Sequence, residues 1–245
     1  MDLLSRKTQE FREKVAALPR EEILEILEIQ DPEIIQQISR IEWVFENKLR
    51  HLNWPDGSQV VERPLTNFEL ALLVDEPFEP IDELTDLGLS IRQQREIHIA
   101  KDAVTWGREF LGVRPRVYQT LIIRHPSLRK VLRAGRRLGK THAMALILLH
   151  YAWTTQNGRA IIVTPVADQA TLIYKQIDEF IESSDLIKDS VDRNVRSPRP
   201  QITFKNGSWI TFFTSGTKSG GKSDATRGQE AHLIVLDELD YMNSE

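Results

Sequence analysis

The pattern of hydrophobic and polar positions differs between the first and the second half of the chain. Through the first fifty residues apolar side chains recur every three or four positions, most clearly in LPREEILEILEIQ and DPEIIQQISRIEWVFENKLRHL. This spacing predicts helices, because it places the apolar side chains on one helix face. Residues 63–83, rich in proline and acids, form a connector with room for one helix at FELALLV. IRQQREIHIAKDAVTWGREFLG then predicts one or two helices.

Beyond residue 116 the pattern changes to alternating helices and strands. Helices are predicted at VYQTLIIRHP, KTHAMALILLHYAWTT and DQATLIYKQIDEFIESS, and strands at LRKVLRA, RAIIVTP and AHLIVLDE. QITFKNGSWITFF contains two β-rich runs around Asn206-Gly207, which predicts a hairpin. Such alternation is typical of an α/β domain with a mainly parallel sheet covered on both faces. We therefore expect an acidic helical region at 1–95 and an α/β core at 96–245.

Composition excludes several classes of protein. The chain has no cysteine, and its six histidines show no metal-ligand spacing, so we expect neither disulfides nor a structural metal. The start, MDLLSRKTQE, carries acids and lacks an apolar core, and the longest nearly apolar run, AMALILLHYAW, is too short to cross a bilayer. These features predict a cytosolic protein without membrane contact.

Charge is distributed unevenly along the chain. The net charge is -4, but residues 110–167 carry ten basic and no acidic side chains, whereas residues 1–109 carry 13 basic and 23 acidic ones. A solvated basic face explains a cationic segment by itself. Here the segment also contains a candidate phosphate-binding motif.

Two stretches compete as the phosphate-binding loop. GTKSGGKS, from Gly216 to Ser223, matches the pattern G-x-x-x-x-G-K-[ST] in full, whereas AGRRLGKT, from Ala134 to Thr141, has alanine at the first position. A phosphate loop joins a strand to a helix whose N-terminus attracts the anion. An apolar helix follows Lys140 and a β-branched run precedes it. Only ten residues separate Lys222 from the next strand, too few for a parallel crossover.

We therefore assign nucleotide binding to the imperfect motif. The full match is interpreted as a Gly/Ser/Lys loop able to contact the phosphates of DNA. The candidate nucleotide ligands are Ala134, Gly135, Arg136, Arg137, Leu138, Gly139, Lys140 and Thr141.

Two acids at the end of the last predicted strand support this assignment. In HLIVLDE a buried strand delivers Asp237 and Glu238 to the carboxyl edge of the sheet. Asp237 would hold Mg²⁺ together with the Thr141 hydroxyl, while Lys140 neutralises phosphate charge. Glu238 would orient and deprotonate the attacking water. The alternative is a strand that ends in a solvated acidic loop.

These motifs together resemble the N-terminal ATPase region of the large terminase subunit, the motor that packages DNA into tailed-phage capsids. The resemblance covers roughly residues 98–245. It rests on the alanine-led phosphate loop with Arg136, on Arg116-Val-Tyr-Gln119, on IIVTPVADQA, and on the run from GTKSG through Thr226-Arg227-Gly228 into the Walker B strand LIVLDELDYM.

The resemblance implies a P-loop NTPase of the RecA-like, additional-strand type that hydrolyses ATP with Mg²⁺ to translocate double-stranded DNA. It further implies portal protein and small terminase subunit as partners, a homo-oligomeric ring, and the host cytoplasm as location. Gln119 would read adenine, or is a packing residue. Arg227 is either an arginine finger offered to a neighbouring subunit or an ordinary surface arginine. Arg136 would contact the γ-phosphate or Glu238.

The chain also departs from the family pattern. Large terminase subunits continue into a nuclease domain, and only seven residues follow Glu238, so we expect no nuclease domain here and a sheet incomplete at its C-terminus. Region 1–95 is a lid or a docking surface. Lys218, Lys222 and the segment 193–199 are candidates for DNA contact by charge alone. The alternatives are a helicase-type nucleic-acid-dependent ATPase and a nucleotide-binding assembly module without hydrolysis.

Overall fold

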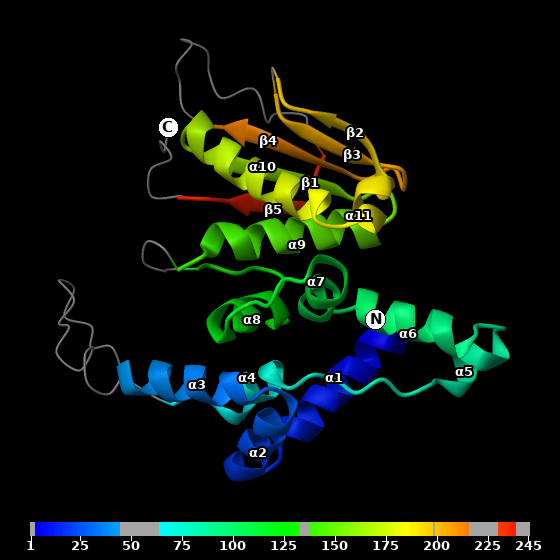
Figure 1. Ribbon diagram of the computed structural model, residues 1–245, viewed down its shortest axis with the longest axis vertical. Coiled ribbons are helices and arrows are strands. Elements are labelled where there is room, and N and C mark those ends of the chain that lie inside the picture. Colours follow the sequence, from blue (N-terminus) through cyan, green and yellow to red (C-terminus); the bar gives the residue numbers. More distant parts are fainter. Residues whose placement is uncertain (1–2, 45–63, 133–137, 198, 216–229, 239–245) are drawn as a thin grey trace. The chain divides into compact units, whose positions relative to one another are not determined.

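A computed structural model describes residues 3–44, 64–132, 138–197, 199–215 and 230–238. The chain divides into two compact units. One comprises Met1–His98 with Pro115–Val131, and the other Ile99–Arg114 with Leu132–Glu245. Figure 1 shows the helices of the first unit and the sheet with its helices in the second. Among the described helices, none combines the length and the apolar character that crossing a membrane requires.

The first unit is helical, as the spacing of its apolar residues predicts. It contains α1 (Leu3–Ala16), α2 (Arg20–Gln30), α3 (Pro32–Val44), α4 (Asn67–Leu73), α5 (Asp82–Asp86), α8 (Val117–Arg124) and most of α6 (Ile91–Ala100). Its core is a cluster of buried aliphatic side chains, which are Val15, Ile23, Leu27, Ile38, Leu70, Ala71, Leu73, Val74 and Val117. The apolar run FELALLV is thus a helix that supplies the centre of this core.

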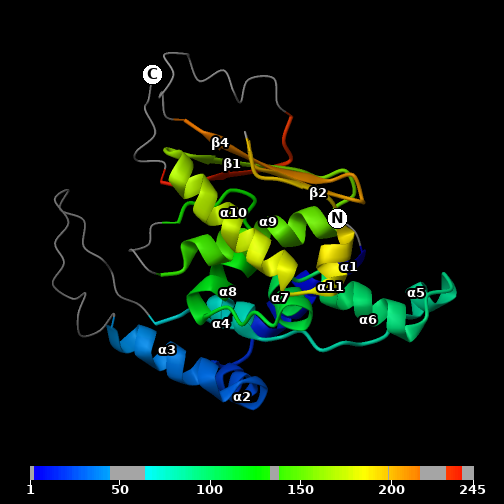
Figure 2. The same cartoon turned by 45° about the horizontal axis from the view of Figure 1, so that its top comes forward.

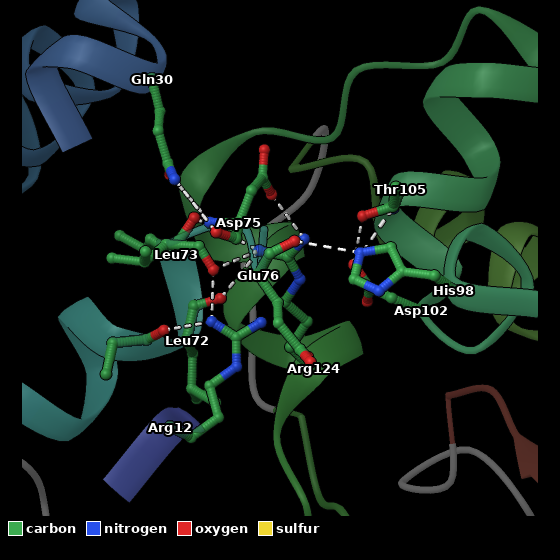
Figure 3. A network of polar contacts seen from close by, with 12 residues as sticks. Arg12, Gln30, Leu72, Leu73, Asp75, Glu76, His98, Asp102, Thr105 and Arg124 are labelled. Atoms are coloured by element: carbon green, nitrogen blue, oxygen red, sulfur yellow. Dashed lines mark hydrogen bonds and ion pairs between the residues drawn. The ribbon is translucent and has the colours of Figure 1, made fainter. Parts of the chain in front are cut away.

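Helix α4 is short, and polar side chains stabilise both of its ends. Thr66 and Glu69 form a capping box: the Glu69 N–H donates to Thr66 Oγ1 (3.2 Å) and the Thr66 N–H donates to Glu69 Oε2 (2.8 Å). At the other end Arg124 donates to the carbonyls of Leu72 (3.1 Å) and Leu73 (3.2 Å) (Figure 3). These bonds satisfy carbonyl groups that the end of a helix otherwise leaves unpaired.

Helix α8 packs with the first unit, although it follows α7 (Ala103–Leu111) of the second unit in sequence. Val117 belongs to the helical core, and its N–H donates to Gln37 Oε1 (3.0 Å). The chain therefore passes from the first unit into the second near residue 98, returns for residues 115–131, and enters the second unit again. A single division between residues 95 and 96 does not represent this path.

The second unit contains a five-stranded sheet of order β2-β3-β4-β1-β5. Strand β1 lies parallel to both β4 and β5, whereas β3 is antiparallel to β2 and to β4. The sheet is therefore mixed, with two parallel and two antiparallel pairings among the described strands, and the prediction of a mainly parallel sheet is not confirmed. The elements, besides α7, are α9 (Lys140–Thr154), β1 (Arg159–Thr164), α10 (Ala167–Glu182), α11 (Asp185–Ser190), β2 (Val191–Val195), β3 (Gln201–Phe204), β4 (Trp209–Thr214) and β5 (Leu233–Leu236).

Helices α9 and α10 pack against each other and against β1 and β4. Figure 2 shows both helices on the same side of the sheet. Burial follows this arrangement: Ala160, Ile162 and Ile210 are fully buried beneath the helices. The Tyr174 and Phe212 rings pack edge to face, with their centroids 5.6 Å apart.

The predicted hairpin is confirmed and is joined to α9. Gly207 has φ +81°, a conformation that suits glycine, and its N–H donates to Phe204 O (2.9 Å). The Asn206 side chain donates to the carbonyls of Ala152 (2.9 Å) and Trp153 (3.1 Å) at the end of α9. The turn thereby caps the helix that follows the candidate phosphate loop.

The strand predicted at LRKVLRA was wrong for the residues that the structure describes, since 128–132 form no strand. The Leu128 and Val131 side chains are 102% and 99% exposed. Lys130 Nζ instead donates to Ile122 O (2.9 Å) and Ile123 O (3.2 Å), which caps α8. Without burial, the apolar residues of the run do not produce a strand.

Candidate active site

The carboxyl end of β5 carries the two predicted acids. The Asp237 N–H donates to Val163 O (3.0 Å), which extends the parallel ladder between β1 and β5 by one bond. Asp237 is thereby fixed at the edge of the sheet, and Glu238 follows it directly. Because β1, β4 and β5 run parallel, this is also the edge at which α10 begins, with two residues between the end of β1 and its first residue.

Helix α9 supplies the second part of the site. Gly139 caps its N-terminus in the left-handed conformation (φ 68°, ψ 30°), and Lys140 and Thr141 are its first two residues. The Ala143 N–H is already bonded to Gly139 O (3.1 Å). The N–H groups of the first turn before Ala143 point out of the helix, and with the helix dipole they favour an anion.

The start of α9 and the end of β5 interact electrostatically. Burial raises the pKa of Asp237 above its ordinary value, and the negative charge of Glu238 raises it further. The positive charge of Lys140 acts in the opposite direction and lowers the pKa of Asp237. One lysine and two carboxyl groups, from segments far apart in sequence, therefore share one region.

Helix α10 contributes a residue for which sequence analysis predicted no role. Gln169 lies in its first turn, and its Nε2 donates to Oε2 of Glu238. The Gln169 Oε1 is buried without a hydrogen-bond partner among the described residues. Glu238 adopts φ 53°, which is uncommon for a residue other than glycine. The stretch TPVADQA pointed to Gln169 as part of a motif, but not to its contact with Glu238.

One protein family resembles the segment of the chain that contains the candidate site. Residues 131–245 match the family model of the N-terminal region of the large terminase subunit, T4likevirus type. The matched segment is slightly less than half of the chain. No curated protein matches the chain.

The solved structures that resemble the chain include the large terminase ATPase domain of Thermus phage P74-26 and an arginine-to-alanine variant of that domain. Their TM-scores are 0.46 and 0.45, and each is 20% identical to this chain. Each match covers 56% of this chain and 58% of the other. The chain thus aligns with little more than half the length of these terminase structures.

Several predicted site residues of the matched segment, residues 131–245, lie outside the described residues. These are Ala134, Gly135, Arg136, Arg137, Lys218, Lys222 and Arg227. Of the predicted phosphate loop, the structure therefore describes Leu138, Gly139, Lys140 and Thr141. Leu138 has an exposed side chain, while Lys140 and Thr141 are half-buried.

Two arginines of segment 193–199 have intramolecular partners. Arg196 forms an ion pair with Asp178 (2.8 Å) and donates to Tyr174 Oη (3.3 Å). Arg199 lies over the Phe213 ring, 4.4 Å from its centroid. Both side chains are thus oriented by the fold, and their contact with DNA stays a prediction.

Gln119 has a structural role at the start of α8. Its Oε1 accepts a hydrogen bond from the Arg116 N–H (2.8 Å), and the residue is buried. It belongs to the first unit, whereas Lys140 and Thr141 belong to the second. Its role as adenine reader stays a prediction.

The carboxylate of Asp237 and the hydroxyl of Thr141 are oxygen donors that suit Mg²⁺. This cation takes few protein ligands, usually one or two carboxylates together with phosphate oxygens and water. Asp237 offers a half-buried carboxylate, and Thr141 a hydroxyl at the start of α9. Among the described residues no group of three or more His, Cys, Asp or Glu side chains could hold a metal by itself. The site thus fits an ion that binds together with a phosphate-bearing ligand.

Proposed function

We propose that this chain binds MgATP at the start of α9 and hydrolyses it as part of a DNA-packaging motor. The observation that carries the proposal is the charged group formed by Lys140, Asp237 and Glu238. A cation at a helix N-terminus suits a polyphosphate, and the two carboxyl groups suit a metal ligand and a base. The match of residues 131–245 to the family model of the large terminase N-terminal region supports the same function.

Each described residue has a distinct task in this reaction. Lys140 neutralises charge on the β- and γ-phosphates, and the α9 N-terminus donates N–H groups to the same phosphates. Asp237 and Thr141 hold Mg²⁺, which when bound neutralises the charge that develops on the phosphate oxygens. Glu238 orients the attacking water and accepts its proton. Arg136 and Arg227 are proposed to stabilise the transferred phosphoryl group, with Arg227 acting on a neighbouring subunit of a ring.

As part of a DNA-packaging motor, the protein is proposed to have double-stranded DNA, portal protein and small terminase subunit as partners. Basic side chains at Lys218, Lys222 and segment 193–199 would contact DNA phosphates, so binding should weaken as salt increases. Residues 1–95, which lie outside the matched region, are proposed as a lid or docking surface for another motor component.

Binding of a non-hydrolysable MgATP analogue to three versions of the chain tests the proposal. We expect Lys140→Ala to abolish binding and Lys222→Ala to leave it intact. The two variants remove the same side chain from competing motifs, so each is the control for the other. Loss of binding in Lys222→Ala alone would assign the nucleotide to GTKSGGKS and overturn the proposed site.

Hydrolysis distinguishes the motor from a nucleotide-binding assembly module. Glu238→Gln should bind the analogue as tightly as the unmodified chain but release phosphate about a hundredfold more slowly, because the amide cannot accept a proton. An unmodified protein that binds ATP yet releases no phosphate, with or without DNA, contradicts the proposed ATPase.

A further inference from the structure

We propose that Gln169 is the residue that positions Glu238 for its reaction with water. The proposal rests on the function proposed above, and it adds a residue from α10 to a site otherwise built from α9 and the end of β5. Its basis is the hydrogen bond from Gln169 Nε2 to Glu238 Oε2, together with the buried, unpartnered Oε1 of the same amide.

Glu238 requires a partner that fixes its side chain. It is exposed. It follows Asp237, whose N–H makes the last hydrogen bond between β5 and β1. Its φ of 53° is strained for a residue with a Cβ. A base in such a position has several side-chain orientations available, and only a few of them suit proton transfer. An additional contact that selects one orientation therefore has a direct effect on rate.

Gln169 can provide this contact because its own backbone is rigidly held. It lies in the first turn of α10, and the following buried residues Ala170, Ile173 and Tyr174 pack the helix against β1 and β4. The distance between α10 and Glu238 is thus set by the pairing of β1 with β5. One carboxylate oxygen of Glu238 is engaged by the amide, which leaves the other oxygen to accept the proton.

The unpartnered Oε1 distinguishes this glutamine from a merely structural one. A buried acceptor without a hydrogen bond is destabilising, and structures rarely retain one without a reason. In this position it is available to a donor that enters the site with the substrate. Gln176, on the same helix, donates to Glu179 Oε2 (3.1 Å) on an exposed face and provides a matched comparison.

Steady-state ATPase kinetics of the full chain test the proposal with Gln169→Met and Gln176→Met. Methionine keeps the length of the side chain but removes the amide. We expect Gln169→Met to lower kcat by about tenfold to a hundredfold with KM unchanged and no change in melting temperature. Gln176→Met should change neither kcat nor KM. In the Glu238→Gln background, Gln169→Met should have no further effect, because the group it positions is already lost.

A second readout needs no activity. The side-chain amide resonances of Gln169 should shift in the nucleotide-free protein when Glu238 is replaced by alanine, whereas those of Gln176 should not. Unchanged kcat in Gln169→Met, in a protein whose unmodified form hydrolyses ATP, overturns the positioning role alone. Absence of hydrolysis in the unmodified protein overturns the proposed function, and the role of Gln169 with it.

Discussion

The ammonium group of Lys140 lowers the pKa of the Asp237 carboxyl group, although burial and Glu238 together raise it. The raising effects are larger, so the folded protein holds the Asp237 proton more tightly than the unfolded chain does. Keeping this carboxylate ionised at neutral pH therefore costs free energy of folding. Such a cost is expected at a site built to bind a cation rather than to stabilise the fold.

Replacement of Asp237 by asparagine should raise the melting temperature of the nucleotide-free protein at pH 7. A raised carboxyl pKa removes stability as the pH rises through the ordinary value of 3.8, and an amide has no charge to bury. The same variant should lose Mg²⁺-dependent binding of the ATP analogue. Thermal melts and binding assays check both expectations. Asp192→Asn, at an exposed position of β2, serves as control and should change neither.

His150 should make the second unit sensitive to acid. Burial lowers its pKa, despite the opposing effects of a hydrogen bond to Ala100 O (2.7 Å) and of the Asp102 charge. The unfolded chain then binds the proton more readily, so stability is complete above the ordinary value of 6.5 and is lost as the pH falls below it. His150→Gln should reduce the loss of melting temperature between pH 7.5 and pH 5.5.

The control for this experiment is His125→Gln, which replaces an exposed histidine. This variant should retain the full acid sensitivity. An equal pH dependence in His150→Gln and the unmodified protein would contradict the assignment to His150.

Gly207→Ala should destabilise the β3–β4 hairpin by about 2–4 kcal/mol, from left-handed strain and overpacking together. The residue has φ +81°, and an added Cβ would lie 2.2 Å from Asn157 Oδ1. Gly112→Ala isolates the strain, since Gly112 has φ +65° and open space around it. Denaturant unfolding should show the smaller loss for Gly112→Ala. In an Asn157→Gly background the effect of Gly207→Ala should decrease toward that of Gly112→Ala.

Arg124→Met should destabilise the first unit by about 3–5 kcal/mol, because it leaves a buried network without its cation. The Arg124 side chain is only 3% exposed, pairs with Asp75 (2.7 Å) and donates to two carbonyls at the end of α4. Arg92→Met removes an exposed ion pair with Glu96 (3.1 Å) in the same unit and should cost less than about 1 kcal/mol. Similar losses in the two variants, measured by urea unfolding, would contradict this role for Arg124.

Elements with strong local patterns were predicted well. The apolar run after Lys140, the β-branched run at 159–164 and the Asn206-Gly207 turn each encode their structure within a few residues, and α9, β1 and the hairpin are all observed. The same reasoning missed β2, whose sequence VDRNV has three exposed central residues. That strand exists because β3 supplies its hydrogen-bond partners, and such pairing leaves no local pattern.

The candidate site likewise combines residues that a local motif indicates with contacts that depend on tertiary structure. Asp237-Glu238 and Gly139-Lys140-Thr141 are runs of adjacent residues, so a short motif and its flanking elements were sufficient to propose them as site residues. The mixed strand order, the exposure of residues 128–132 and the contact of Gln169 with Glu238 depend on segments far apart in the chain. Hydrophobic periodicity specifies which face of a helix or strand is buried, but not which element packs against that face. The pairing of β1 with β5 brings the start of α10 to the end of β5, next to Asp237 and Glu238.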